Sequence, residues 1–124
     1  NFIRILEIFD HHFINLKKVV SSCSITDAET KQTLKAVYQQ KKYLLDPHGA
    51  VGYFALQQYQ QANPGQKGIV VETAHPVKFF DVVEPITGEP VLIPPTVQAQ
   101  LLLQKKSTKI AADAGMLKQF LLAL

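Results

Sequence analysis

Apolar residues along the first part of the chain recur at steps of three and four, the spacing that places side chains on one face of a helix. One predicted helix covers residues 2–18 and carries this face on Phe2, Ile5, Leu6, Phe9, Phe13 and Leu16. Thr26 and Glu29 then have the spacing of a capping box, in which each side chain accepts from the backbone amide of the other residue. A second helix is therefore predicted from Thr26 to about Lys42.

Asp46 and Pro47 mark another helix start, because Asp46 can cap a helix and Pro47 needs no amide hydrogen at the first helical position. The helix predicted over Pro47–Gln60 contains Gly49 and Gly52 in its first half. A glycine inside a helix costs about 1 kcal/mol relative to alanine. We therefore expect another element to approach this part of the helix closely, or a ligand to lie beside it.

A short β-branched run at Gly68–Glu72 predicts a buried strand of the parallel type. After it, Pro76 is a good first residue for a helix that runs toward Glu84, and Pro85 discourages any continuation. The fold class is thus predicted as α/β, mostly helical with one parallel-type strand. One strand cannot form a sheet, so its unpaired amides require neighbours from a longer parent polypeptide or from a partner chain.

The last part of the chain gives weaker patterns. Three prolines make residues 89–95 an irregular arm, and short apolar stretches predict helices over Val97–Gln104 and Ala111–Leu124. We therefore divide the chain into residues 1–88, which hold the main helices and the strand, and residues 89–124, which hold the arm and the terminal helices.

Composition narrows the classes of protein that fit. The 124 residues suit one domain, and no apolar run approaches the ~20 residues that span a bilayer. The net charge of +3 comes with scattered lysines, which argues against nucleic-acid binding. The lone Cys23 cannot form an internal disulfide and favours a reducing, cytoplasmic location. The chain opens on Asn1 without an initiator methionine, so we expect a piece of a longer protein.

Candidate chemistry gathers where the predicted strand ends, because ligands of open α/β sheets bind beyond the carboxyl ends of the strands. Thr73 and His75 lie there, beside the free amides of the next helix. From position alone, Thr73 can equally be a capping hydroxyl, and His75 a packed or capping histidine. His48 suits capping or packing better than function, and the adjacent His11 and His12 diverge too far on a helix to share a metal. No metal site is predicted.

Two stretches taken together resemble the C-terminal part of threonine synthase. The first is Tyr43–Tyr53, with the sequence YLLDPHGAVGY, and the second is Glu72–Phe79, with the sequence ETAHPVKF. Residues 1–4 and the helix predicted over residues 26–38 are also similar to this family, and the likeness fades after Gly88.

The resemblance implies a pyridoxal-phosphate-dependent enzyme of fold type II, with three αβα layers. Such an enzyme converts O-phospho-L-homoserine and water to L-threonine and phosphate. The resemblance places Thr73 at the pyridine nitrogen of the cofactor, where a hydroxyl can donate to a neutral ring nitrogen. His75 becomes a candidate to support Thr73 without touching the cofactor itself. Lys78 could attract an anionic substrate or could simply be a solvated helix residue.

The family carries its Schiff-base lysine and its cofactor-phosphate loop N-terminal to this region. The chain alone is therefore predicted to be inactive, with no catalytic residue of its own and with unidentified substrate contacts.

Two hypotheses fit these residues. In the first, the chain is the C-terminal part of threonine synthase, and its partners are the rest of the parent chain and the substrate O-phosphohomoserine. In the second, it is a stand-alone α/β interaction module that kept the predicted strand-to-helix corner, residues 69–78, without the catalysis. In either case the exposed strand edge can drive self-association. The upstream reading frame separates the two, because the enzyme needs a lysine-bearing segment and a Gly/Asn-rich loop there.

Overall fold

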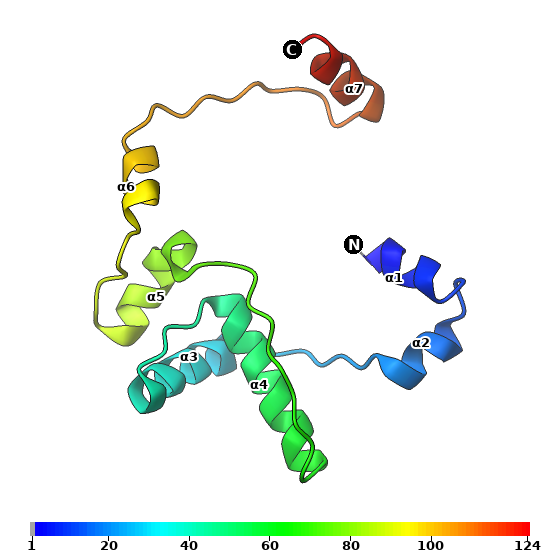
Figure 1. Ribbon diagram of the computed structural model, residues 1–124, viewed down its shortest axis with the longest axis vertical. Coiled ribbons are helices and arrows are strands. Elements are labelled where there is room, and N and C mark those ends of the chain that lie inside the picture. The colour runs from blue at the N-terminus through cyan, green and yellow to red at the C-terminus, as the bar shows by residue number, and fades with distance from the viewer. Residues whose placement is uncertain (1) are drawn as a thin grey trace. The chain divides into compact units, whose positions relative to one another are not determined.

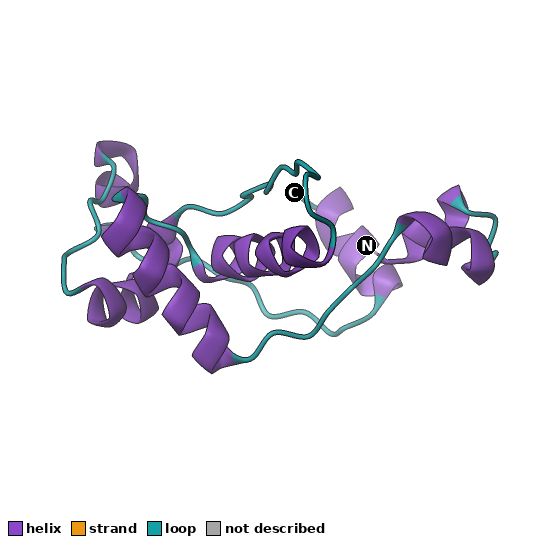
Figure 2. Ribbon diagram, turned by 90° about the horizontal axis from the view of Figure 1, so that it is seen from below, coloured by secondary structure: helices purple, strands orange, loops and turns teal. Residues whose placement is uncertain are grey.

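The computed structural model describes residues 2–124, and over that range it consists of helices joined by turns and extended segments (Figure 1 and Figure 2). It divides into two units, one that ends at Leu92 and one that covers Ile93–Leu124, and each is described by itself. The helical elements are α1 (Phe2–Ile8), α2 (Phe13–Val19), α3 (Asp27–Lys41), α4 (Pro47–Ala62), the 3₁₀ helix η1 (Pro76–Phe79), α5 (Phe80–Thr87), α6 (Pro95–Leu101) and α7 (Ala114–Leu122). No helix in the described range has the length and apolar character that a membrane span requires.

The helix predicted over residues 2–18 is in fact two helices, α1 and α2, so that prediction is wrong about its continuity. Asp10 and His11 adopt left-handed backbone angles, with φ of 49° and 56°. The His11 amide donates to the Leu6 carbonyl at 2.8 Å, a bond typical of a helix C-terminus that ends in this conformation. Asp and His tolerate left-handed angles better than most residues, so the chain turns here without a glycine.

α3 begins where the capping box predicts it. The Glu29 amide donates to Thr26 Oγ1 at 3.3 Å, and the Thr26 amide donates to the Glu29 carboxylate at 2.8 Å. The helix ends at Lys41, so its predicted extent is confirmed. Leu34 and Val37 are buried on the inner face of this helix.

α4 begins at Pro47 with Asp46 as its N-cap, as the sequence predicts. The expected close approach is also confirmed, because the segment after α4 runs back beside the helix (Figure 1). A methyl group added at Gly52 would lie only 3.3 Å from Val70 Cγ1. The missing side chain at Gly52 therefore lets Val70 pack on α4.

The predicted strand is wrong, and with it the α/β fold class, because the described residues contain helices and no strand. Residues 68–72 follow α4 without helical structure, yet they form no ladder with another segment in the described range. A β-branched run favours extended backbone, but a ladder needs a neighbour. The two outward-facing side chains, Ile69 and Val71, are 91% and 77% exposed, whereas Val70 between them is half-buried.

The helix predicted to begin at Pro76 does begin there, first as the 3₁₀ turn η1 and then as α5. The expectation that Pro85 discourages continuation is wrong, because Pro85 lies inside α5. Its ring is exposed, and the helix closes two residues later when the Gly88 amide donates to the Glu84 carbonyl at 2.8 Å. Gly88 has a φ of 75°, which a glycine adopts without strain.

The core of the first unit lies among α3, α4 and α5. Its buried apolar residues are Leu34, Val37, Leu45, Ala50, Val83 and Val91. Val91 comes after α5, and its amide donates to Glu84 Oε1 at 2.9 Å. This bond ties the segment after Gly88 to α5, so that the segment packs on the core.

The second unit contains α6 and α7. Both predicted terminal helices are present, although each is shorter than its apolar stretch suggested. α6 begins at Pro95, and α7 is capped by Asp113, which accepts from the Met116 amide at 2.9 Å.

Candidate functional site

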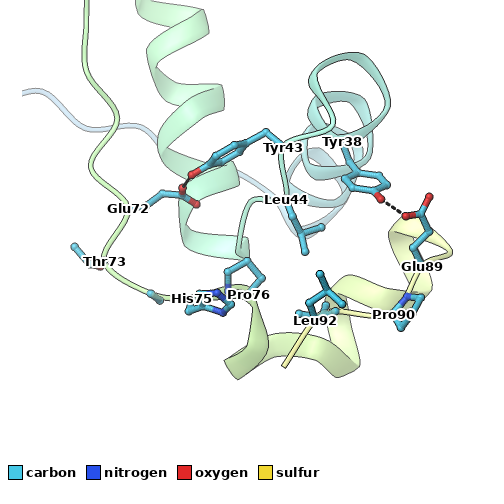
Figure 3. A pocket seen from close by; sticks show the side chains of 12 residues that line it. Tyr38, Tyr43, Leu44, Glu72, Thr73, His75, Pro76, Glu89, Pro90 and Leu92 are labelled. Atoms are coloured by element: carbon cyan, nitrogen blue, oxygen red, sulfur yellow. Dashed lines mark hydrogen bonds between the residues drawn. The ribbon is translucent and has the colours of Figure 1, made fainter. Parts of the chain in front are cut away.

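Residues 72–76, between the extended segment after α4 and the start of η1, form one side of a hollow of about 680 Å³ (Figure 3). The hollow is lined from three directions: by two tyrosines at the end of α3 and in the loop after it, by residues 72–76 of the corner, and by residues 89–92 after α5. The charged side chains in this lining are both carboxylates, Glu72 and Glu89. The hollow therefore offers acceptors and aromatic surface rather than positive charge.

Glu72 anchors the corner to the loop after α3. The Tyr43 hydroxyl donates to Glu72 Oε2, and this bond, together with the negative charge of the carboxylate, raises the pKa of the Tyr43 phenol. The other carboxylate oxygen, Oε1, is buried and has no hydrogen-bond partner among the described residues. A methyl group at Gly49 would overlap with Oε1, so the carboxylate uses space that only a glycine leaves free.

A second tyrosine–carboxylate pair lies on the opposite wall (Figure 3). The Tyr38 hydroxyl donates to Glu89, which raises the pKa of the Tyr38 phenol. Glu89 is itself held near α5, because its amide donates to Thr87 Oγ1 at 3.3 Å. Sequence reasoning missed both pairs, since their partners lie 29 and 51 positions apart and no local spacing connects them.

Thr73 is exposed and lies in the lining of the hollow, although the strand end at which the sequence placed it is absent. Its side chain and that of Glu72 project to opposite sides of the backbone (Figure 3). Glu72 and His75 are each held by a hydrogen bond, whereas no bond is drawn from Thr73 to the other residues of the hollow. The N-cap of η1 is His75 rather than Thr73, and the Thr73 side chain projects away from Tyr43 (Figure 3).

His75 is the N-cap of η1, which is the capping alternative left open by the sequence. Its Nδ1 accepts from the Val77 amide at 3.1 Å, so this nitrogen carries no proton while the bond is made. The imidazole thereby fixes the start of η1 directly after the corner. A supporting role toward Thr73 stays a prediction.

Asp46 and His48 form a pair that the sequence indicated only in part. The side chain of Asp46 is fully buried, and its Oδ1 accepts from the Gly49 amide at 2.8 Å. Its Oδ2 lies 2.8 Å from His48 Nδ1, and the His48 ring packs against Phe79 with ring centres 5.1 Å apart. The pair therefore joins the start of α4 to the end of η1.

Lys78 is exposed in η1 and is not part of the lining of the hollow. Its backbone amide donates to the His75 carbonyl at 3.0 Å, which places it beside the corner. Within residues 2–124, no group of three or more His, Cys, Asp or Glu side chains is arranged to hold a metal ion.

The sequence profile of a family described as "Threonine synthase, C-terminal" matches residues 49–121, which is more than half of the chain and includes the whole corner. The chain belongs to the threonine synthase family. The threonine synthase of Haemophilus influenzae is 36% identical over 122 residues, which cover 98% of this chain and 28% of that relative. The threonine synthase of Escherichia coli (strain K12) is 33% identical over the same shares.

The solved structures give the same result. The crystal structure of threonine synthase from Escherichia coli matches with a TM-score of 0.76 and 32% identity, over 97% of this chain and 27% of that chain. The chain thus spans about 28% of the length of the curated threonine synthases that it matches. The resemblance seen in Tyr43–Tyr53 and Glu72–Phe79 is therefore confirmed, and the roles of single residues in that family's site stay predictions.

Proposed function

We propose that this chain acts as the C-terminal part of a threonine synthase, within a longer polypeptide that converts O-phospho-L-homoserine and water to L-threonine and phosphate. The observation that carries the proposal is the combined match: nearly the whole chain aligns with about 28% of curated threonine synthases. The proposed cytoplasmic location rests on Cys23, which is exposed and unbridged. The polypeptide that contains this chain is called the full-length polypeptide below.

The cofactor implied by the family is pyridoxal phosphate, and the corner has a residue that fits part of it. Thr73 is exposed and its hydroxyl is not engaged by the residues drawn around the hollow. A hydroxyl can donate to a neutral ring nitrogen, which suits a ligand on the exposed side of the segment. When bound, pyridoxal phosphate supplies an electron sink for bond changes at the carbons of an amino-acid substrate. In this proposal Thr73 holds the ring nitrogen, and His75 keeps the backbone after Thr73 in place.

The rest of the full-length polypeptide supplies what this chain lacks in the proposal. The lysine that holds the cofactor and the loop for its phosphate belong to the preceding part. The outward face of the extended segment, with Ile69 at 91% and Val71 at 77% exposure, is the surface that the preceding part would cover. If it is left uncovered, the same apolar face is a candidate for self-association.

The test of the proposal compares Thr73→Val with Thr73→Ser in the full-length polypeptide. Valine removes the hydroxyl at nearly constant shape, so phosphate release from O-phospho-L-homoserine should fall about tenfold or more in kcat, the equivalent of about 1.4 kcal/mol. Serine keeps the hydroxyl and should stay within about threefold of the wild type. Unchanged kcat and kcat/KM in the valine variant would remove Thr73 from the site.

A second measurement concerns the chain alone. Pyridoxal phosphate added to it should give no stoichiometric adduct that borohydride fixes on one lysine. Such an adduct, or turnover of substrate by the chain alone, would contradict the division of labour proposed here.

A further inference from the structure

We infer that Glu72 is a positioning residue for Thr73, held by the Tyr43 hydroxyl on one side and by the slot at Gly49 on the other. The inference rests on the proposed function, and it adds three residues to the support of the cofactor site. Glu72 and Thr73 are neighbours in an extended segment, so their side chains point to opposite sides of the same backbone (Figure 3). Whatever holds Glu72 in one orientation therefore also fixes the backbone from which the Thr73 side chain projects.

The slot at Gly49 is the first support. Gly49 is buried in the first turn of α4, and a methyl group there would overlap with Glu72 Oε1 and lie 3.0 Å from Cγ and Cδ of the same side chain. Gly52 is the other glycine of α4, and a methyl group added there would meet only Val70, at 3.3 Å. The two glycines differ sharply, because one makes room for a carboxylate and the other only for a methyl contact.

The Tyr43 hydroxyl is the second support. It donates to Glu72 Oε2, so that the carboxylate lies between the loop after α3 and the start of α4. A group held from two elements loses the rotamer freedom that a surface glutamate normally keeps. The Glu72 carboxylate thus connects the corner to the loop after α3 and to the start of α4.

The unpartnered oxygen shows what this arrangement costs. Glu72 Oε1 is buried without a hydrogen bond in the described part of the chain. Leaving a buried acceptor unsatisfied is unfavourable, because its hydration is lost without a replacement bond. An alanine in place of Glu72 would avoid that cost, but it would also remove the contact that holds the segment before Thr73. In this inference, the position of Thr73 explains why the unfavourable burial is kept.

Five variants of the full-length polypeptide test the inference. Gly49→Ala fills the slot, and Gly52→Ala is its matched control in the same helix. Glu72→Ala removes the carboxylate, and Glu72→Gln keeps the shape of the side chain and an acceptor oxygen for the Tyr43 hydroxyl. The double variant Gly49→Ala/Glu72→Ala combines the two main changes. Two readouts are measured for each: the dissociation constant of pyridoxal phosphate for the cofactor-free protein, by fluorescence titration, and the hydrogen-exchange rate of the amides over residues 72–74, without cofactor.

Gly49→Ala and Glu72→Ala should each raise the dissociation constant and the exchange rate about tenfold, equivalent to about 1.4 kcal/mol. Gly52→Ala and Glu72→Gln should stay within about twofold of the wild type on both readouts. The double variant should match Glu72→Ala alone, because the added methyl group then has no carboxylate to displace. A role in general stability alone would lower the melting temperature without this local and non-additive pattern.

Some outcomes overturn the inference. Independent, additive effects of Gly49→Ala and Glu72→Ala would show that the slot does not act through Glu72. Faster exchange with an unchanged dissociation constant would show that Glu72 orders the segment without positioning Thr73 for the cofactor. A wild-type protein that binds no pyridoxal phosphate would overturn the proposed function instead, and the exchange rates would still decide whether Glu72 orders the corner.

Discussion

The carboxylate of Asp46 orients the imidazole of His48 at the start of α4. Asp46 is fully buried, His48 keeps 70% of its side chain exposed, and Oδ2 of the one lies 2.8 Å from Nδ1 of the other. A carboxylate only accepts, so Nδ1 carries the hydrogen in this bond. The same carboxylate caps α4 through the Gly49 amide, and one buried side chain thus serves both the helix start and the histidine.

We predict that Asp46→Ala lowers the free energy of unfolding of the full-length polypeptide by about 1–2 kcal/mol, because the N-cap of α4 is lost. Asp46→Asn keeps an oxygen that can accept from the Gly49 amide, so it should lose clearly less. The measurement is the urea midpoint, followed by circular dichroism. Equal losses in the two variants would show that the cap is not what Asp46 contributes.

Local signals explain the parts of the fold that the sequence predicted well. The Thr26–Glu29 box and the Asp46–Pro47 start involve partners within three positions, and both are observed. The break at Asp10 was missed, because neither a glycine nor a proline marks it. The β-branched run at Gly68–Glu72 was predicted as a strand and is not one. Whether such a run pairs depends on residues far away in sequence or in another part of the polypeptide.

The site divides in the same way. Thr73 and His75 were singled out because they follow the run that was predicted as a strand. That strand is absent, and both residues nevertheless line the hollow. The contacts that hold the hollow could not be found, since Tyr43 meets Glu72 across 29 positions. Gly49 is intermediate, because its helical cost predicted a close neighbour without naming Glu72.

Leu34 gives a test of the core on which the hollow rests. It is fully buried in α3, one turn before Tyr38. Leu34→Ala should lower the free energy of unfolding by about 2–5 kcal/mol, since it leaves a cavity among packed helices. Leu34→Met conserves volume and should cost less than about 1.5 kcal/mol. Urea unfolding measures both, and a small loss in the alanine variant would mean that α3 is not packed as described.

The Tyr43–Glu72 bond predicts a pH dependence on the alkaline side. The bond to Glu72 raises the pKa of Tyr43 above its ordinary value of about 10, because the neutral phenol is the form that donates. The stability that it contributes is therefore fully present below about pH 10 and is lost as the pH rises through the raised pKa.

The measurement compares the wild type with Tyr43→Phe, which has no proton to lose at this position. The difference in free energy of unfolding should be constant near neutral pH and should shrink above about pH 10. Tyr59→Phe, in an exposed ring on α4, is the control for loss of a hydroxyl. A difference that grows with pH would have the wrong sign for a donated bond.

The bond between Glu84 and the Val91 amide holds residues 89–92, which line one side of the hollow, and it predicts the effect of a Glu84 variant on this segment. At 2.9 Å it joins the segment after the Gly88 turn to α5, next to the buried side chain of Val91. Glu84→Ala removes the acceptor and should raise the hydrogen-exchange rate of the Val91 amide about tenfold, whereas Glu84→Gln keeps an acceptor oxygen and should change it little.

Because Glu89 lies on the same segment, Glu84→Ala should also weaken its bond from Tyr38 and so bring the raised pKa of that phenol back toward its ordinary value. Titration of the phenols by ultraviolet absorbance, with Tyr38→Phe to assign the signal, measures that shift, and an unchanged Tyr38 titration in Glu84→Ala would show that the wall holds without Glu84.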